Sequence, residues 1–212
     1  MLSVVIRTNN GEQLLPEVLR PLISAAAEGV VRDVVFLDLG SRDGTAMIAD
    51  TAGAAMVSAK SDGFDGALAQ AHRGSWLLLL DQNTVLAAGW MEESVGFVER
   101  QDRLRVSQSR SAACFRPEHE PELGSGDLRR RITVLATNRL ASRAFLSQGI
   151  LVRRAVLMGA RAPVINWREG EPTMTAPGLM RLRSRSYLAR PLPAPKDEMI
   201  SAPRGAHVAD HS

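Results

Sequence analysis

The stretch from residue 74 to residue 84 constrains the fold more than any other, because an apolar run ends abruptly in polar side chains. Residues 76–80 are large and apolar, too few for a membrane span, and Asp81, Gln82 and Asn83 follow them. Such a run is typical of a strand buried on both faces, inside a parallel sheet covered by helices. Ligands of open α/β sheets bind beyond the carboxyl ends of the strands, so we expect Asp81 and Asn83 at the rim of a cleft.

Strand and helix patterns alternate through the first hundred residues. Alternating or continuous apolar runs predict strands, and apolar spacings of three and four residues predict helices. Polar side chains also end the strands predicted before the central one, at Thr8 to Asn10 and at Asp38, and Thr45 is expected to cap the second helix. This order predicts an α/β fold with a doubly wound, mostly parallel sheet. The expected strands are residues 2–7, 34–38, 54–59, 76–80 and 148–152, and the expected helices are residues 12–27, 46–52, 66–73, 90–100 and 153–158, with one more starting at Asp127.

The chain divides into one domain and two C-terminal segments. With 212 residues, 45% of them hydrophobic, it can bury one sizeable core, which we place at residues 1–161. Residues 162–190 are expected to form an irregular basic extension, whose arginines suit contact with an anionic membrane surface. Residues 191–212 are rich in proline and small polar residues and are expected to be a disordered tail.

Charge and cysteine content restrict the compartment and the partners. The formal net charge is +3, and the arginines cluster locally, which does not favour a nucleic-acid partner. The single cysteine, Cys114, cannot form an internal disulfide, and we expect it to be a small buried side chain. Residues 1–7 lack the pattern of a secretion signal. These features favour a cytoplasmic protein, with the inner face of the membrane as a place where the basic extension would act.

Three groups of polar residues are expected to meet at one edge of the sheet. Thr8 to Asn10, Asp38 and residues 81–83 all follow predicted parallel strands, so they would line one cleft. Taken singly, an aspartate at the end of a strand is more often a turn former or helix cap than a ligand. The convergence of the three groups, not any one of them, indicates a site.

The amino-acid sequences of several segments, and the order of these segments along the chain, resemble those of the family 2 glycosyltransferases of GT-A fold. The similar segments are residues 3–10, 35–45, 66–68, 73–84 and 89–90, and residues 148–154 resemble the acceptor-side segment of that family. The resemblance implies a GT-A type, Rossmann-like three-layer α/β/α sandwich. It also implies transfer of a sugar from a nucleoside diphosphate sugar to a lipid-linked or saccharide acceptor.

The resemblance places nucleotide-sugar contacts at the ends of the first two strands. Thr8 and Asn10 match positions that meet the base and ribose in the family. Asp38 matches the first carboxylate of the family's Asp-Asp-Gly-Ser motif, whereas the second carboxylate is replaced by Leu39. A leucine can pack against a base but cannot accept its N–H, so base selectivity should be weaker or reside elsewhere.

The family's Asp-x-Asp motif is incomplete in this chain. Asp81 matches its first carboxylate, near the ribose, and Asn83 replaces the second carboxylate, which binds the metal. Both residues are expected to contact the nucleotide sugar and to be the ligands of Mg²⁺ or Mn²⁺. Hard cations prefer charged oxygen ligands, so Asn83 should weaken the metal site.

The general base of an inverting transfer has no clear counterpart. The family usually supplies it from an acidic pair after the acceptor-side segment, and Glu169 and Glu171 occupy roughly that region. Their spacing singles out neither residue, and two exposed loop glutamates would look the same. Glu169 and Glu171 are therefore the candidate catalytic residues.

Two functional hypotheses remain open. The first is an active glycosyltransferase, preferred because a site in which arginines replace the metal is chemically feasible. The second is a catalytically inactive relative that acts as a binding or regulatory partner, favoured by Leu39, Asn83 and the missing acidic pair. A nucleotide-binding oxidoreductase is disfavoured because no Gly-x-Gly-x-x-Gly follows the first strand.

Overall fold

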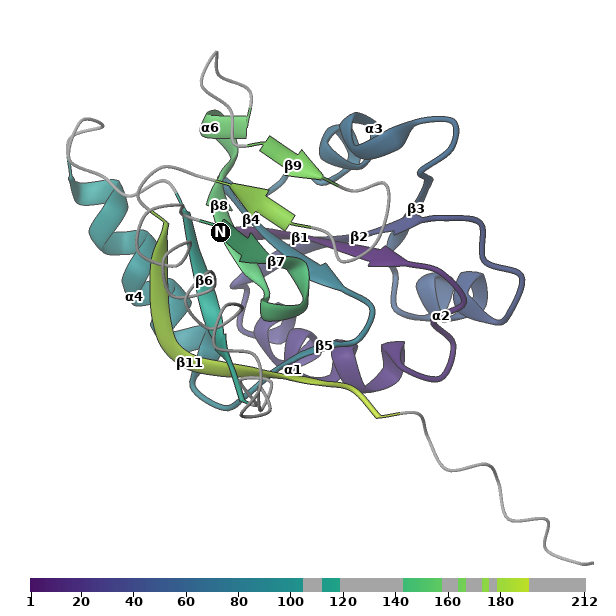
Figure 1. Cartoon of the computed structure of the whole chain (residues 1–212), viewed down its shortest axis with the longest axis horizontal. Helices are drawn as coiled ribbons and strands as arrows, with labels where there is room; N and C mark the ends of the chain where they lie inside the picture. Colours follow the sequence, from purple (N-terminus) through teal and green to yellow (C-terminus); the bar gives the residue numbers. More distant parts are fainter. Residues whose placement is uncertain (105–111, 119–142, 158–163, 167–172, 176–178, 191–212) are drawn as a thin grey trace, which may run out of the picture.

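The computed structural model describes residues 1–104, 112–118, 143–157, 164–166, 173–175 and 179–190, and its centre is an eight-stranded sheet (Figure 1). The strand order is β3-β2-β1-β4-β8-β6-β11-β5. The strands are β1 (Leu2–Thr8), β2 (Val31–Asp38), β3 (Ala55–Ser58), β4 (Trp76–Asp81), β5 (Thr84–Leu86), β6 (Ala112–Pro117), β8 (Ile150–Arg153) and β11 (Met180–Leu188).

Helices cover both faces of this sheet, which makes a three-layer α/β arrangement (Figure 1). A separate small sheet has the order β7-β10-β9. The helices are α1 (Leu15–Ala27), α2 (Thr45–Thr51), α3 (Gly63–Gln70), α4 (Trp90–Arg103), the short α6 (Arg154–Leu157) and the 3₁₀ turn η1 (Leu146–Gln148), and the small sheet contains β7 (Arg143–Phe145), β9 (Val164–Asn166) and β10 (Thr173–Thr175).

The main sheet is parallel on one side and mixed on the other. Strands β3, β2, β1 and β4 all run in the same direction, as the strand and helix order predicted. Strand β8 is antiparallel to both β4 and β6, and β11 is parallel to β6 but antiparallel to β5. The carboxyl ends of β1, β2 and β4 therefore lie along one edge.

The core explains why residues 76–80 are continuously apolar. Leu78 and Leu80 of β4 pack with α1, α2 and α4 on one face of the sheet, whereas Leu77 and Leu79 pack with α3 on the other. All four side chains are fully buried. Since successive strand residues point to opposite faces, only a strand covered on both sides requires this pattern, and the prediction of such a strand is confirmed.

Strand β11 lies where the sequence analysis placed an irregular basic extension, so that prediction is wrong over residues 180–188. It pairs with β6 on one side and β5 on the other, inside the main sheet. Leu182 and Ser186 point inward and are buried, while the arginines between them are exposed. Buried and exposed residues thus alternate with the period of two that is typical of a strand. Because one buried position is a serine, a pattern of hydrophobic residues alone does not show this alternation.

Strand β6 lies in a region where the sequence carried little signal. Its buried residues include Ala112 and Ala113, which pack on opposite faces of the sheet and have low strand propensity. The helix expected from Asp127 and the tail expected at residues 191–212 lie outside the described residues.

The second helix begins differently from the expectation. Thr45 is the first residue of α2, and Gly44 precedes it as the cap without a side-chain hydrogen bond. The Thr45 hydroxyl donates to Asp43 Oδ1 at 2.6 Å and accepts from the Gly11 N–H at 2.9 Å. The prediction of Thr45 as the N-cap is wrong because its hydroxyl joins two loops instead.

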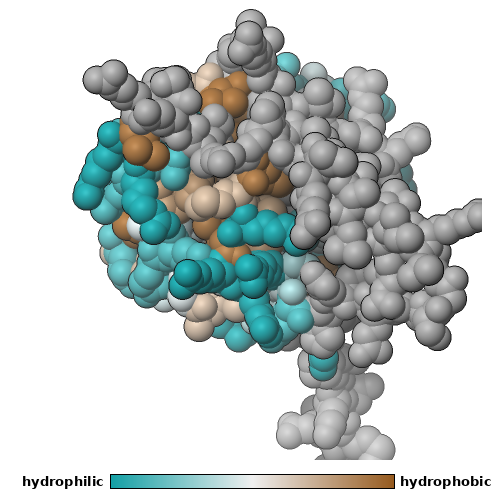
Figure 2. All heavy atoms as spheres, turned by 60° about the vertical axis from the view of Figure 1, so that its left-hand side comes forward, coloured by the Kyte–Doolittle hydropathy of each residue, from teal (hydrophilic) through white to brown (hydrophobic). Residues whose placement is uncertain are grey.

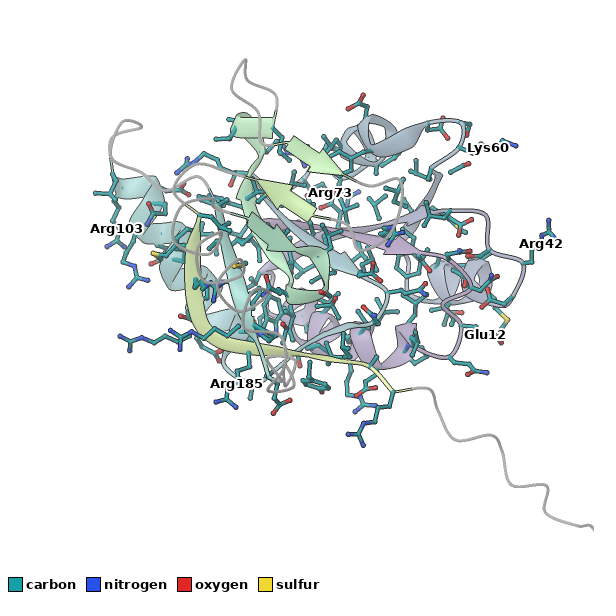
Figure 3. The ribbon with its side chains drawn as sticks, viewed as in Figure 1. Glu12, Arg42, Lys60, Arg73, Arg103 and Arg185 are labelled. Carbon is teal, nitrogen blue, oxygen red and sulfur yellow. The ribbon has the colours of Figure 1, made fainter. Side chains whose placement is uncertain are left out.

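The face formed by α4 and β11 is largely hydrophilic, with hydrophobic side chains between the charged ones (Figure 2). Its exposed arginines include Arg103, Arg181, Arg183 and Arg185, and Arg103 and Arg185 extend from the periphery of the molecule (Figure 3). Within the part of the chain that the structure describes, no helix has the length and apolar character required to cross a bilayer.

Candidate functional site

A hollow of about 180 Å³ opens where β1 and β4 end. The parallel register sets Arg7 beside Asp81 and Thr8 beside Asp38. The strand ends that carry the predicted polar residues therefore lie together at one edge of the sheet. The residues that line the hollow are Arg7, Thr8, Asn9, Leu39, Asp81 and Gln82.

Asp38 shapes the loop that borders this hollow. Its carboxylate accepts hydrogen bonds from the N–H groups of Gly40 and Ser41 and from the Ser41 hydroxyl, at 2.5–3.1 Å. Such bonds to the backbone two and three residues onward are those of a turn former. Asp38 therefore acts on the hollow through the neighbouring residue, Leu39, which lines it and is 37% exposed.

Asn10 connects the loops that follow β1 and β2. Its backbone is left-handed, with φ 53°, which asparagine tolerates better than most residues. Its side-chain oxygen accepts from the Arg42 N–H at 2.9 Å, and its own N–H donates to Ser41 Oγ at 2.8 Å. Asn10 is thus adjacent to the hollow but does not line it.

Further bonds fasten the same two loops. The Glu12 N–H donates to Asp43 Oδ2 at 3.0 Å, and the Gly44 N–H donates to Glu12 Oε2 at 2.9 Å. Burial raises the pKa of Asp43, but hydrogen bonds from the Thr45 hydroxyl and from the N–H groups of Glu12 and Thr45 outweigh it, and the pKa is lowered. Figure 3 shows Glu12 and Arg42 at this end of the molecule. The loops form a preorganised rim.

Gln82 joins the ends of β1 and β4, a role that the sequence analysis missed. Its Oε1 accepts from the Thr8 hydroxyl at 3.1 Å and from the Asn9 N–H at 2.6 Å. Thr8 is only 1% exposed. A Cβ at Gly11 would lie 2.7 Å from Thr8 Oγ1 and 3.0 Å from Gln82 Oε1, so only glycine fits behind this pair.

The charged residues of the hollow are Arg7 and Asp81, and they bind each other. Arg7 Nη1 donates to Asp81 Oδ2 at 2.9 Å, with side-chain exposures of 17% and 13%. Burial raises the pKa of Asp81, and the charge and hydrogen bond of Arg7 oppose this shift without cancelling it. Arg7 was not among the site residues expected from the sequence, although a charge at the end of a buried strand is the signal that singled out Asp81.

The Asn83 backbone N–H donates a hydrogen bond to the Asp81 carboxylate, but its side chain does not join Asp81 in the hollow. Its side-chain oxygen is buried and has no hydrogen-bond partner among the described residues, and Asn83 does not line the hollow. Its backbone oxygen accepts from the Ala189 N–H at 2.7 Å, which ties the turn to the end of β11. The structure therefore does not present Asp81 and Asn83 as two ligands of one open site.

Residues 148–154, which resemble the family's acceptor-side segment, reach the same edge from the opposite direction. Strand β8 is antiparallel to β4, and Ile150 pairs with Leu79, so Gly149 lies near the carboxyl end of β4. Gly149 has φ +74°, and a Cβ there would lie 3.0 Å from Phe115 and 3.1 Å from Leu80. The candidate bases, Glu169 and Glu171, lie outside the described residues.

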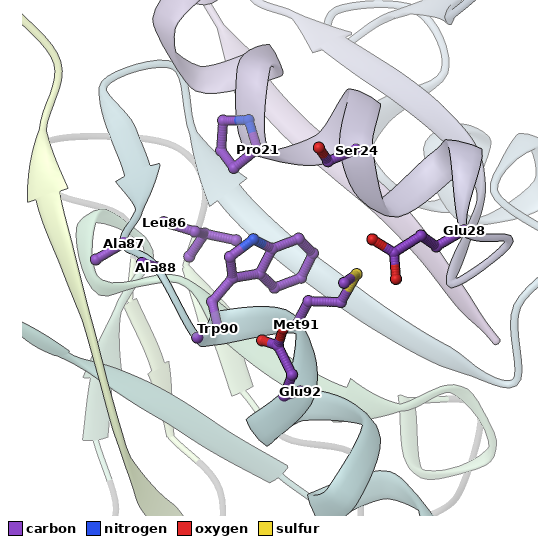
Figure 4. A pocket seen from close by; sticks show the side chains of 10 residues that line it. Pro21, Ser24, Glu28, Leu86, Ala87, Ala88, Trp90, Met91 and Glu92 are labelled. Atoms are coloured by element: carbon purple, nitrogen blue, oxygen red, sulfur yellow. The ribbon is translucent and has the colours of Figure 1, made fainter.

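A second hollow of about 290 Å³ lies between α1 and the start of α4 (Figure 4). The Trp90 indole, only 4% exposed, forms its floor, and the carboxylates of Glu28 and Glu92 lie around it. None of the polar groups that the sequence analysis singled out lies here. The hollow at the carboxyl edge is therefore the candidate site.

Comparison with solved structures defines the class of fold: it is the GT-A type, Rossmann-like α/β fold of glycosyltransferases. Residues 1–349 of TarS from S. aureus, solved with UDP-GlcNAc, match with 15% identity over 88% of this chain and 57% of that one, with a TM-score of 0.59. Glucosyl-3-phosphoglycerate synthase from Mycobacterium tuberculosis, solved with Mn²⁺, UDP and phosphoglyceric acid, matches with 20% identity over 74% of this chain and 57% of that one, with a TM-score of 0.50.

These similarities concern the fold. The chain spans less than two thirds of either solved structure, at 57% of each. A comparison with protein-family models and one with curated protein sequences each return no match.

Proposed function

We propose that this chain is a glycosyltransferase domain that binds a nucleoside diphosphate sugar in the hollow at the carboxyl edge of β1 and β4. The observation that carries the proposal is the lining of this hollow, where polar Thr8, Asn9 and Gln82 meet apolar Leu39 beside a charged pair. Such a mixture suits a base, a ribose and a phosphate group. The solved TarS and glucosyl-3-phosphoglycerate synthase structures contain UDP-GlcNAc and UDP, which supports a UDP-sugar as donor.

The predicted nucleotide-sugar residues have two kinds of role in this proposal. Thr8 and Asp81 face the hollow and contact the donor. Asn10 and Asp38 hold the rim loop that presents Leu39 to the base. A loop already fixed by hydrogen bonds loses little conformational freedom when a ligand binds.

The acceptor is proposed to approach past Gly149, which immediately precedes β8. The proposed acceptor is a saccharide or a lipid-linked molecule, and Glu169 or Glu171 is the proposed general base for its hydroxyl group. The exposed arginines of β11, Arg181, Arg183 and Arg185, are the residues that would contact an anionic membrane surface.

Calorimetric titration of the whole chain with UDP, GDP and UDP-GlcNAc tests the donor site. We expect UDP binding that Thr8→Val weakens about tenfold, because the buried hydroxyl is lost while the shape is kept. Arg103→Ala, on the exposed end of α4, is the matched control and should bind UDP unchanged. If no nucleoside diphosphate binds at millimolar concentration, the proposal fails.

A catalytically inactive binding partner is the second candidate. The ion pair of Asp81 and the buried amide oxygen of Asn83 favour it, because neither group is free to hold a metal ion. Release of UDP from UDP-sugars separates the two candidates. Binding without turnover, across a panel of saccharide and lipid-linked acceptors, would establish the inactive partner.

A further inference from the structure

The pair of Arg7 and Asp81 leaves part of the guanidinium group unused. Asp81 engages Nη1, and Nε of Arg7 is buried without a hydrogen-bond partner in the described part of the chain. A buried, unpaired donor costs free energy, and native structures rarely retain one without a reason. Arg7 lines the hollow and its side chain is 17% exposed, so part of the guanidinium group is accessible to a ligand there, whereas the buried Nε is reached only when the side chain shifts.

The residues of this hollow do not fit a divalent cation. Asp81 has one carboxylate oxygen bound to Arg7, and the other candidate ligand, the side-chain oxygen of Asn83, is buried outside the hollow. No group of three or more His, Cys, Asp or Glu in the described ranges is placed to hold a metal ion. Mg²⁺ and Mn²⁺ take mainly oxygen ligands, several of them charged, and a cation beside Arg7 would also be repelled.

The net charge of the hollow indicates that a guanidinium group takes the place of a metal ion. Two carboxylates and one divalent cation sum to zero, and so do one carboxylate and one guanidinium. Of the six residues that line the hollow, Arg7 and Asp81 are the charged ones. Arginine stays charged at all relevant pH values and binds phosphate through two parallel N–H groups.

We propose that this chain binds the diphosphate of its donor without a metal ion, with Arg7 as the cation that meets the phosphate groups and Asp81 as the residue that orients it. The proposal rests on the proposed function, since it concerns the same hollow. Asp81 retains Nη1 while Nε and the other terminal nitrogen donate to a phosphate oxygen. A small shift of the guanidinium group towards the phosphate gives Nε, buried in the free protein, the acceptor that it lacks there.

Titration with UDP in EDTA and again in Mn²⁺ tests the metal, and substitution of Arg7 tests the cation. We expect the same dissociation constant for UDP in both buffers. Arg7→Met should weaken UDP binding by about tenfold to a hundredfold, as for loss of a charge-assisted hydrogen bond. Arg7→Lys keeps the charge but not the paired N–H groups and should fall between wild type and Arg7→Met.

Two further variants serve as controls. Arg73→Met removes an exposed arginine that precedes the amino end of β4, away from the carboxyl edge, and should leave UDP binding unchanged. Arg7→Gln/Asp81→Asn removes both charges and leaves groups that can still bond to each other, so it keeps the fold even where Arg7→Met is poorly folded. It should lose UDP binding as Arg7→Met does.

Each contrary result has a separate meaning. UDP binding that requires Mn²⁺ overturns the metal-free site but leaves the donor site standing. Metal-free UDP binding that Arg7→Met and the double variant leave unchanged overturns the role of Arg7. Absence of binding by UDP and GDP in every buffer overturns the proposed function itself.

Discussion

Glu93 of α4 holds Ser184 of β11 with two hydrogen bonds of 2.6 Å, one from the Ser184 N–H and one from its hydroxyl. The same carboxylate accepts from the Arg183 N–H at 2.6 Å. The pairing of β11 with β6 shifts register between Arg181 and Arg185, so these N–H groups lie at an irregularity of the ladder. A helix side chain thus satisfies backbone donors that the sheet leaves free.

Replacement of Glu93 by Gln is expected to destabilise the protein by about 1–2 kcal/mol, because hydrogen bonds to a charged acceptor become bonds to a neutral one. Urea unfolding followed by circular dichroism measures the change. Glu92→Gln, at the exposed neighbouring position, is the control and should be nearly neutral. Equal effects of the two substitutions would show that Glu93 does not secure β11.

The effect of Glu93→Gln should also depend on pH. Burial raises the pKa of Glu93, but the hydrogen bonds from Arg183 and Ser184 outweigh it, so the folded-state pKa lies below the ordinary value of 4.5. Its stabilising contribution is therefore complete above about pH 4.5 and disappears as the pH falls through the folded-state pKa. Unfolding curves of both proteins between neutral and acidic pH should converge at the acidic end.

Gly74 precedes β4 and lies against the backbone of β1. A Cβ there would collide with the Ser3 N and the Leu2 carbonyl carbon, and the Gly74 N–H donates to Ser3 Oγ at 2.8 Å. Gly74→Ala must move one strand away from the other and should cost about 1–3 kcal/mol or more. Gly96→Ala is the matched control: Gly96 lies within α4 with open space around its Cβ position, so alanine should stabilise by about 0.5–1 kcal/mol. Thermal unfolding of both variants gives the comparison, and two changes of the same sign would contradict it.

Cys114 should not react with thiol reagents in the folded protein. It is 1% exposed, and burial raises its thiol pKa to about 11, an effect that the charge of Arg181 only partly opposes. We expect no modification by iodoacetamide at pH 8 in buffer and rapid modification in urea, followed by mass spectrometry. Rapid modification of the folded chain would show that strand β6 opens readily.

The ion pair of Arg7 and Asp81 should contribute little net stability. Arg7→Met or Asp81→Leu alone leaves one charge unpaired in the hollow and should cost about 1–3 kcal/mol, while the double variant should return near the wild type. A double-mutant cycle by urea unfolding measures this coupling. If the single effects simply add, the two side chains are not coupled in solution.

The free energies of unfolding in this double-mutant cycle should depend on pH, because Asp81 titrates. Because the folded-state pKa of Asp81 is raised, mainly by burial, its contribution to stability is greatest at low pH and is lost as the pH rises from the ordinary value of 3.8 through the folded-state pKa. The double variant lacks this group, so it should gain stability relative to wild type over that range. The reverse trend would mean that Arg7 outweighs the burial of Asp81.

The sequence by itself determined the first half of the sheet and the edge at which it carries polar residues. The run of residues 76–80 requires a strand covered on both faces, and Thr8, Asp38 and Asp81 end strands that proved to be parallel neighbours. These are local signals, because each depends on residues close together in the chain. The burial of Cys114 was predicted on another ground, because a single cysteine with no partner is most often a small buried side chain.

Only the tertiary structure decided what these polar residues do. Asp38 acts as a turn former and Arg7 pairs with Asp81 across 74 positions, and neither fact can be derived from single strands. The placement of β11 likewise depends on Glu93 and on the register with β6, ninety and about seventy residues earlier in the chain. Contacts between distant segments form only when the whole chain folds, so local sequence patterns predict the strands but not the partners of their side chains.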